Sequence, residues 1–244
     1  MPANFRVRRE DQSLRSMTVS TLRRAIFSLH ISPGTRVTER KLCDLTGVSR
    51  SLMREALRDL EAQGLISNVP HRSRVIATIT PKDAQEIYEI RCALEPMAAR
   101  LFVERASEDQ VWEIEERADV CRQAMEKHDV LEVIEALDNF YSMLFSGAGN
   151  RMAAMLARNL YTKAGLLRAL TFQRQEPSDT KQSMAHIRRI ASAIRERDAD
   201  AAAEACVTQV KRSWKVAMRL LRPTIEASAP KKRASLSKSQ RDSR

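Results

Sequence analysis

The stretch PGTRVTERKLCDLTGVSRSLMREALRDLEAQGLI, residues 33–66, decides the fold of the N-terminal third of this 244-residue chain. Thr38 and Ser49 each stand directly before a run with helical apolar spacing, where a hydroxyl side chain caps a helix. Gly47 separates the two runs, and Gly64 stands where a glycine commonly ends a helix. The stretch therefore predicts a short helix, a glycine turn and a second helix, in the order of a helix-turn-helix.

The residues on either side of this stretch complete a small domain. Apolar residues between 18 and 30 recur at helical spacing, so a first helix is expected there, after a flexible arm of residues 1–17. Residues 65–79 carry β-branched residues around the polar turn 71–74, which predicts a two-stranded hairpin. Residues 18–79 are therefore predicted to form a winged helix-turn-helix.

The remainder of the chain has a different pattern. After Pro81, apolar residues recur with a helical period as far as Arg222, and no strand pattern is visible. We expect about six helices in an all-α bundle over residues 80–222. The proline that follows Arg222 is expected to end the bundle, and residues 223–244 are predicted to be a disordered basic tail. The predicted fold class is mainly α.

The net charge of +11 is unevenly distributed. Residues 1–78 contain 14 Lys and Arg against 7 Asp and Glu, residues 79–222 contain 22 of each, and residues 223–244 contain 6 against 2. A basic domain joined to a neutral one is typical of a polyanion binder attached to a region with another task. From the charge distribution alone, a basic surface that has no binding function is an equally good explanation.

The composition disfavours several classes of protein. No two of the four cysteines form a CxxC pair. We therefore expect them to be small buried residues of a protein in a reducing compartment. No apolar run reaches the ~18 residues expected of a membrane span, and the N-terminus lacks the apolar core of a secretory signal, so a cytoplasmic location is expected. The chain has no Gly-rich phosphate loop, nucleophile elbow or HExxH motif, and we therefore expect no enzyme activity.

The second helix of the predicted helix-turn-helix carries a basic stripe. Arg50, Arg54 and Arg58 are four residues apart and share one helix face. Arginine makes bidentate contacts to guanine, and Ser49 and Ser51 at the helix N-terminus can bind phosphate. The pattern favours entry of this helix into the major groove of DNA. If only the periodicity of the arginines is considered, a basic helix face exposed to solvent is an equally good explanation.

Other charged residues accompany this stripe. In the hairpin turn, His71, Arg72 and Arg74 are placed like a wing over the DNA backbone or minor groove. Glu55 either contacts cytosine or, as we favour, pairs with Arg58 or a neighbouring arginine and orients it.

The quoted stretch resembles the winged-helix signature of the GntR family of transcription regulators. The matches at fixed spacing are Pro33-Gly34, Glu39, Leu42, Gly47-Val48-Ser49-Arg50, Arg54-Glu55-Ala56-Leu57, Leu60-Glu61 and Gly64-Leu65. The resemblance implies wing contacts over 71–74 and helix contacts to DNA at Arg40, Arg50, Ser51 and Arg54. Two positions depart from the pattern: Leu52, where many members have Pro, and Ser73, where Gly is frequent.

Residues 83–222 resemble the FCD effector domain of FadR-type members, an all-helical domain of six or seven helices. The matches are Ile87-Tyr88-Glu89-Ile90-Arg91, Leu94-Glu95, Gly149-Asn150, Ile190, Ala193-Ile194, Asp198 and Ala202. The resemblance implies a homodimer on a palindromic double-stranded operator, controlled by a small effector bound in the bundle. A repressor is expected, and an architectural or non-specific DNA-binding protein is the alternative.

Many FCD domains bind a metal through one Asp and three His. The resemblance places these four positions at Leu137, Tyr141, Ile187 and Gln209. Because none of them is a good metal ligand, no metal cofactor is expected. Asp138 and His186 are each one residue away, about 100° of helix rotation, and form the alternative ligand set if the register is shifted.

The pocket behind those positions is expected to bind an organic molecule, with an organic acid favoured. Tyr141 and Gln209 are candidate hydrogen-bonding groups, and a core role for Tyr141 is the slightly favoured alternative. Arg91 is the candidate for recognising a carboxylate. Glu95, four residues further on, offers Arg91 a salt bridge as an equal alternative.

Overall fold

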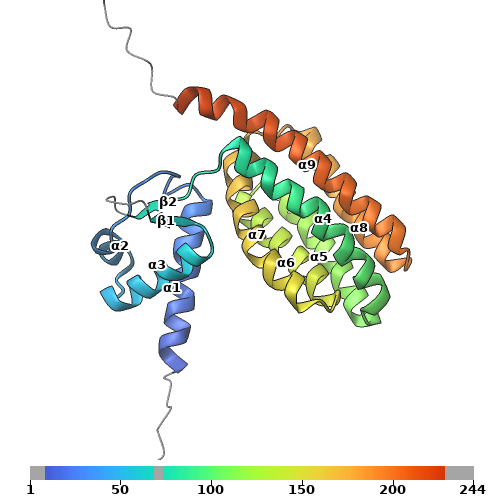
Figure 1. The fold of residues 1–244 in the computed structure, drawn as a ribbon, viewed down its shortest axis with the longest axis horizontal. Helices are drawn as coiled ribbons and strands as arrows, with labels where there is room; N and C mark the ends of the chain where they lie inside the picture. The colour runs from blue at the N-terminus through green and yellow to red at the C-terminus, as the bar shows by residue number, and fades with distance from the viewer. Residues whose placement is uncertain (1–8, 69–73, 229–244) are drawn as a thin grey trace, which may run out of the picture.

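The chain forms an N-terminal unit and a helical bundle that lie side by side (Figure 1). The computed structural model describes the backbone of residues 9–68 and 74–228, and the side chains of residues 14–68 and 74–221. The N-terminal unit contains α1 to α3 and strands β1 and β2, and the bundle contains α4 to α9. The prediction of a mainly α protein with a small winged helix-turn-helix in front of a bundle is confirmed.

Three helices build the N-terminal unit: α1 (Arg9–Phe27), α2 (Glu39–Thr46) and α3 (Arg50–Ala62). Both predicted caps are present, because Thr38 Oγ1 accepts a hydrogen bond from the backbone N–H of Lys41 and Ser49 Oγ from that of Leu52. Gly47 ends α2 with a φ of 73°, in the left-handed region that glycine enters without strain. The predicted helix-turn-helix is therefore confirmed.

α1 begins nine residues before the predicted start at Thr18, so the prediction of a flexible arm over 1–17 is wrong for residues 9–17. The reason lies in a contact between distant parts of the sequence. The guanidinium of Arg15 donates to Asp59 Oδ2 at 2.7 Å and to Glu55 Oε2 at 3.2 Å, and both acceptors belong to α3. These polar contacts hold the extra turns, and apolar periodicity does not reveal them.

The wing is a hairpin of two short strands, β1 (Ile66–Asn68) and β2 (Arg74–Ile76). They pair antiparallel with Ile66 opposite Ile76, as predicted for residues 65–79. Arg36 adds an isolated bridge to Val75, so the segment before α2 lies beside the wing. The turn between the strands, residues 69–73, lies outside the described part of the chain.

The bundle consists of six helices within the described residues: α4 (Pro81–Arg105), α5 (Glu108–Lys127), α6 (Val130–Gly147), α7 (Arg151–Thr171), α8 (Pro177–Arg195) and α9 (Ala199–Ser228). A short 3₁₀ turn, η1 (Phe172–Arg174), follows α7. α9 packs along α4 and α8, and α5 packs against α6 and α8. The expected helical bundle is confirmed.

The end of the bundle differs from the prediction. α9 continues through Pro223 to Ser228, six residues beyond the predicted end at Arg222. A proline inside a helix removes one backbone hydrogen bond and crowds the preceding turn, but the helix before it already packs against two neighbours. Pro96 lies inside α4 in the same way. The rest of the predicted tail, residues 229–244, lies outside the described residues.

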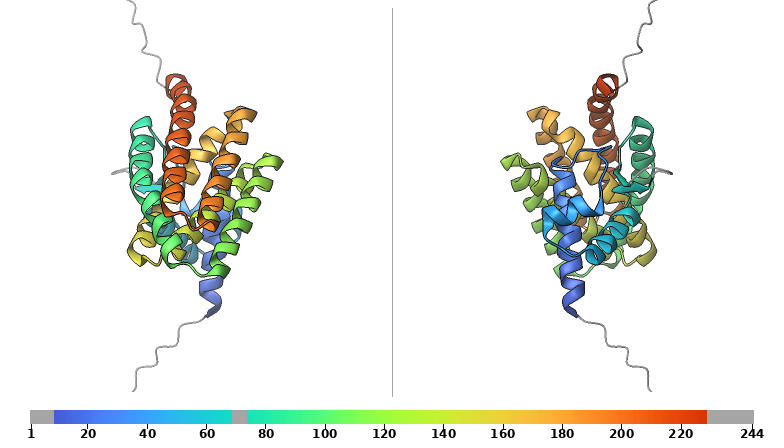
Figure 2. Two further views of the ribbon diagram at one scale, coloured as in Figure 1. Left: turned by 90° about the vertical axis from the view of Figure 1, so that its right-hand side faces the viewer. Right: turned by 90° about the vertical axis from the view of Figure 1, so that its left-hand side faces the viewer.

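The two units share an apolar seam. Phe27 of α1 lies against Gly165 of α7, where an added Cβ would be 3.0 Å from the Phe27 ring and 3.3 Å from Ile134. The buried core of the N-terminal unit accordingly includes Ile134, Leu166 and Ala169 of the bundle. The N-terminal unit therefore rests on α6 and α7 through packed side chains, and Figure 2 shows it in front of the bundle when viewed from its own side.

Candidate nucleic-acid interface and effector cavity

The arginine face of α3 is turned away from the core. Four apolar residues form the buried side of the helix, Met53, Ala56, Leu57 and Leu60. The opposite side is open to solvent because a helix buried on one stripe exposes the other. The exposed side chains include all of the predicted contacts that the structure describes in this region, Arg40, Ser49, Arg50, Ser51 and Arg54.

Glu39 links α2, α3 and the wing. Its two carboxylate oxygens accept hydrogen bonds from Nε and Nη2 of Arg54, each at 3.3 Å, and Oε1 also accepts from Nη1 of Arg74 at 2.9 Å. Arg74 pairs in addition with Glu61. Hydrogen bonds from Arg54 and then Arg74 lower the pKa of Glu39. The charge of Arg74, predicted to be available for the wing, is therefore engaged inside the protein.

Glu55 and Ser49 on α3 both have partners within the protein. Glu55 forms an ion pair, as favoured, but its partner is Arg15 of α1 rather than Arg58. The packing of α1 across α3 brings Arg15 to that position, which sequence spacing does not show. Ser49 Oγ serves as the helix cap and lies 3.1 Å from Ser51 Oγ. His71 and Arg72 lie outside the described residues.

An ion pair is buried at the centre of the bundle. Arg91 Nε donates to Glu95 Oε1 at 2.6 Å, and the two side chains are 2% and 0% exposed. The hydroxyl of Tyr161 donates to the same Glu95 oxygen at 2.7 Å, and Arg91 Nη2 donates to the hydroxyl of Tyr141 at 3.4 Å. The rings of Tyr141 and Tyr161 stack with centroids 4.6 Å apart. The salt bridge that the spacing of Arg91 and Glu95 allows is therefore present.

Arg91 also borders a small cavity to which all six bundle helices, α4 to α9, contribute, and we call it the central cavity. Its volume is about 40 Å³, and its polar lining comprises Tyr88, Arg91, Arg168, Thr171, Gln175, Thr180, Ser183, Gln209, Arg212 and Ser213. Gln209, a predicted effector contact, lies here, whereas Tyr141 reaches the cavity only through its hydrogen bond with Arg91.

The central cavity contains polar groups whose partners are incomplete. Gln209 Oε1 and Thr180 Oγ1 are buried and have no hydrogen-bond partner among the described residues. Arg168 has no carboxylate within ion-pair distance in that same part of the chain, while Arg212 lies 3.7 Å from Asp179 Oδ1. Burial lowers the pKa of Arg212. Buried polar groups of this kind are normally satisfied by water or a ligand.

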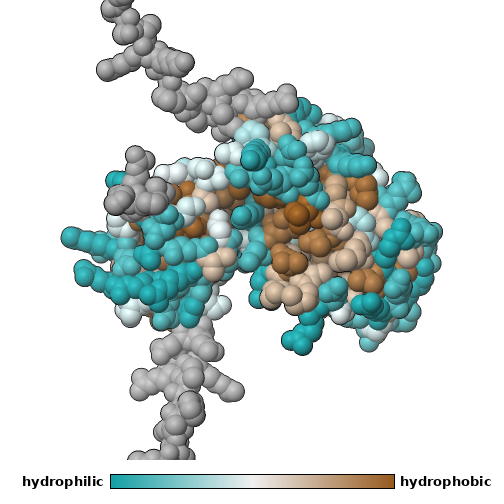
Figure 3. All heavy atoms as spheres, viewed as in Figure 1, coloured by the Kyte–Doolittle hydropathy of each residue, from teal (hydrophilic) through white to brown (hydrophobic). Residues whose placement is uncertain are grey.

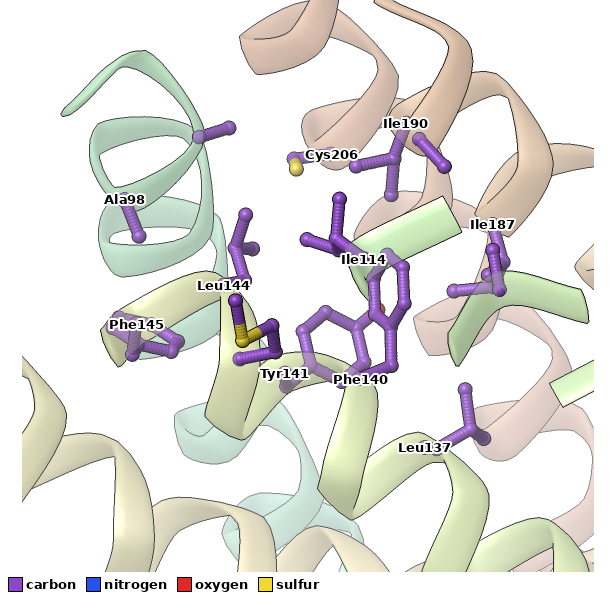
Figure 4. Packing of buried hydrophobic residues seen from close by; sticks show 14 of the residues in the cluster. Ala98, Ile114, Leu137, Phe140, Tyr141, Leu144, Phe145, Ile187, Ile190 and Cys206 are labelled. Carbon is purple, nitrogen blue, oxygen red and sulfur yellow. The ribbon is translucent and has the colours of Figure 1, made fainter. Parts of the chain in front are cut away.

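The four positions that the family resemblance assigns to a metal lie around the core. Leu137 and Gln209 line the central cavity, and Figure 4 shows Leu137, Tyr141 and Ile187 among the packed apolar side chains. The Leu and Ile side chains offer no ligand atom, and no group of three His, Cys, Asp or Glu suited to a metal ion occurs in the described residues. Asp138 lines other cavities, and burial lowers the pKa of His186 on α8.

The sequence is similar to known proteins in both units. Residues 14–76 match the family described as bacterial regulatory proteins, gntR family, and residues 86–211 match the FCD domain. The HTH-type transcriptional repressor RspR of Escherichia coli K12 is 30% identical over 188 residues, which cover 77% of this chain and 81% of that protein. The chain belongs to the GntR family.

Other relatives of this GntR-family chain agree. The uncharacterized HTH-type transcriptional regulator YdhC of Bacillus subtilis 168 is 29% identical, over 74% of this chain and 80% of that protein. The solved structure of E. coli McbR/YncC has the same fold, with a TM-score of 0.74, 19% identity, and coverage of 84% of this chain and 97% of that chain. The chain is thus a DNA-binding transcription regulator with an FCD effector-binding domain.

In this GntR-family regulator, sequence reasoning did not single out several polar residues of the central cavity. It missed Arg168, Arg212 and Thr180 in the central cavity. One signal was available, because Arg212 follows Gln209 by three residues and so shares its helix face. Arg168 and Thr180 become neighbours only when α7 and α8 pack.

No helix in the described part of the chain is both long and apolar enough to cross a membrane.

Proposed function

We propose that this GntR-family regulator is a homodimeric repressor that binds a palindromic operator with α3 of each subunit in the major groove. The observation that carries the proposal is the exposed Arg50 and Arg54 face beside the Ser49-capped N-terminus of α3. Arginine reads guanine, and a helix N-terminus with serine hydroxyls suits a phosphate. The relative RspR is named a transcriptional repressor, which supports repression rather than activation in this proposal.

An apolar surface on the bundle supports the homodimer. Apolar side chains gather over α4 and α7, as Figure 3 shows. Ile90 of α4 and Met152 and Leu156 of α7 are 51%, 64% and 58% exposed. The two helices pack against each other, and the apolar surface in Figure 3 extends over both. A second copy of the chain would remove this patch from water and place the two α3 helices by a two-fold axis.

The effector in this proposal is an organic acid bound in the central cavity without a metal. Arg168 supplies a cation that has no carboxylate partner among the described residues. Gln209 Oε1 is a buried acceptor without a hydrogen-bond donor in the same part of the chain. A hydroxy or amino acid would satisfy both groups. The cavity of about 40 Å³ must enlarge to admit such a molecule, so binding would separate helices and shift the bundle toward another conformation.

Operator selection tests the DNA-binding part. The full-length protein is used to select binding sites from a random double-stranded pool, and the recovered sites are footprinted. We expect a palindrome whose half-sites lie about 34–36 Å apart, or a multiple of one helical turn. Uniform coating of DNA without a selected motif would contradict the proposal and favour an architectural role.

The dimer and the effector each have a separate test. Leu156→Glu should yield a monomer by sedimentation, whereas Val120→Glu, at a 50% exposed apolar residue on α5, should leave the dimer intact. A stable dimer in the Leu156 variant would show that another surface joins the subunits. Elemental analysis should find no stoichiometric metal, and Arg168→Ala should remove the thermal stabilisation that hydroxy acids confer.

A further inference from the structure

A second and larger cavity lies on the outside of the bundle, next to the N-terminal unit. Its volume is about 460 Å³, which is within the range of small-molecule sites. α6 and α7 form its walls, and Arg23 of α1 adds to its lining, close enough to Asp138 for its charge to act on that carboxyl group. We call it the outer groove, and its polar lining comprises Arg23, Asp138, Ser142, Ser146, Asn150, Arg151, Arg158 and Thr162.

The outer groove carries positive charge without matching negative charge. Arg23, Arg151 and Arg158 all line it, and none of the three forms a salt bridge within the described part of the chain. Asp138 carries the one carboxylate among the described lining residues. Burial raises the pKa of Asp138, against the opposing effect of Arg23. Three guanidinium groups around one cleft therefore favour an anionic occupant.

The arginines are spread along the groove. The lining follows α7 from Arg151 to Thr162, which corresponds to a rise of about 16 Å in an α-helix. Arg151 lies in the first turn of α7, after the Asn150 cap, where backbone N–H groups add to its charge. Arg158 is about 10 Å further along the helix axis. Two acidic groups at opposite ends of a ligand would each meet a guanidinium group.

The remaining lining of the groove is mostly apolar. Tyr141, Phe145, Ala157 and Tyr161 lie beneath it and are at most 4% exposed, and Ala154 is partly buried, so an organic body between those ends would rest on a closely packed layer. Tyr141 and Tyr161 are the stacked pair whose hydroxyls contact Arg91 and Glu95. The aromatic floor of the outer groove is therefore in direct contact with the polar network of the central cavity.

We propose that the outer groove is a second ligand site, which binds an elongated organic anion with an acidic group, phosphate or carboxylate, at each end. One group binds Arg151 and the α7 N-terminus, and the other binds Arg158 and Arg23. Since Arg23 belongs to the N-terminal unit, the ligand bridges the two units and favours one placement of α1 on the bundle. The site is separate from the central cavity and does not depend on the proposed effector.

Calorimetric titration of the full-length protein, free of DNA, tests this inference. The probes are fructose 1,6-bisphosphate and adipate, which distinguish a phosphate ligand from a carboxylate ligand, with inorganic phosphate as the single-anion comparison. We expect saturable binding of at least one two-ended probe. Arg151→Ala and Arg158→Ala should each weaken it by about tenfold or more, because a hydrogen bond to a charged group is lost.

Three further variants separate a built site from diffuse charge. Asp138→Asn should tighten binding, because it removes the carboxylate that faces the anion, and a purely structural role would not produce a gain. Arg188→Ala, at an exposed arginine of α8 outside the groove, should leave the affinity unchanged. Arg168→Ala, in the central cavity but close enough for its charge to act on Asp138, should weaken binding far less than Arg158→Ala.

The inference is overturned if neither two-ended probe binds saturably or if Arg188→Ala weakens binding as much as Arg158→Ala. An equal loss in the Arg168 variant would place the probe in the central cavity instead. If Arg151→Ala and Arg158→Ala reduce DNA affinity but no probe binds, the groove is a contact for the DNA backbone. None of these outcomes depends on operator specificity, so the proposed function can stand while this inference fails.

Discussion

Arg50 and Arg54 on α3, and Arg91 and Glu95 on α4, are two pairs with the same spacing of four residues in very different surroundings. The α3 arginines are exposed, whereas Arg91 and Glu95 are almost completely buried. An exposed guanidinium such as that of Arg50 keeps its hydrogen-bonding capacity for a ligand outside the protein, although Arg54 already donates two hydrogen bonds of 3.3 Å to Glu39. A buried one requires an internal partner, since an uncompensated charge in a core is strongly unfavourable. The same residue type is therefore available for recognition in one unit and forms internal structure in the other.

The largest effect is expected from breaking the buried pair. Glu95→Ala leaves the Arg91 guanidinium uncompensated in the core and should lower the free energy of unfolding by about 3–5 kcal/mol. Chemical denaturation measures it. The matched control is Glu113→Ala, which breaks the partly exposed pair of Glu113 and Arg117 at the same spacing and should cost at most about 1 kcal/mol. Equal losses in the two variants would show that burial does not set the difference.

The next effect concerns the exposed pair. Arg50→Ala or Arg54→Ala should reduce operator affinity by about 1–3 kcal/mol, the range for a lost base contact, and reduce affinity for unrelated DNA much less. Competition binding at fixed salt measures both. Arg50→Ala should change the stability of the protein little, whereas Arg54→Ala also removes a hydrogen-bond partner of Glu39 and should lower it slightly. Arg122→Ala, at an arginine of α5 far from α3, serves as the control. Equal losses on operator and unrelated DNA would make these arginines phosphate contacts alone.

Glu39 should show how arginine partners affect an acid near the surface. Its folded pKa is lowered by Arg54 and Arg74, so the ionised form stabilises the fold. This contribution is present above the unfolded pKa and is lost as the pH falls through the folded pKa. Glu39→Gln should therefore cost about 1 kcal/mol at neutral pH, and the difference should disappear in acid. A loss that is the same at every pH would contradict this.

The smallest effect is expected at Asp138, whose pKa is shifted in the opposite direction to that of Glu39. Its folded pKa is raised, chiefly by burial, so the ionised carboxylate destabilises the fold at neutral pH. Asp138→Asn should increase stability by less than about 1 kcal/mol at neutral pH, a size usual for a partly exposed site. The gain should fade as the pH falls through the folded pKa towards the unfolded one. Thermal unfolding over a pH series measures it, and a loss at neutral pH would reverse this interpretation.

Local signals in the sequence were sufficient for much of the fold. Thr38 and Ser49 cap their helices, and Gly47 adopts the left-handed conformation that ends α2. These features depend on a few neighbouring residues, so they are visible without tertiary information. The start of α1 was missed because Arg15 is held by Asp59, which is 44 residues away. The end of α9 was missed because the helix, which packs against α4 and α8, continues through Pro223 to Ser228.

The sequence by itself determined the order of the two units, the helix caps and the basic face of α3, since each follows from residue type and spacing within a few turns of helix. Tertiary structure decided the state of each charge. It buried Arg91 with Glu95, gave Glu55 the distant partner Arg15, and lined the outer groove with arginines from α1 and α7. Burial and partner distance control the energy of a charge, and both arise only when elements far apart in the sequence pack together.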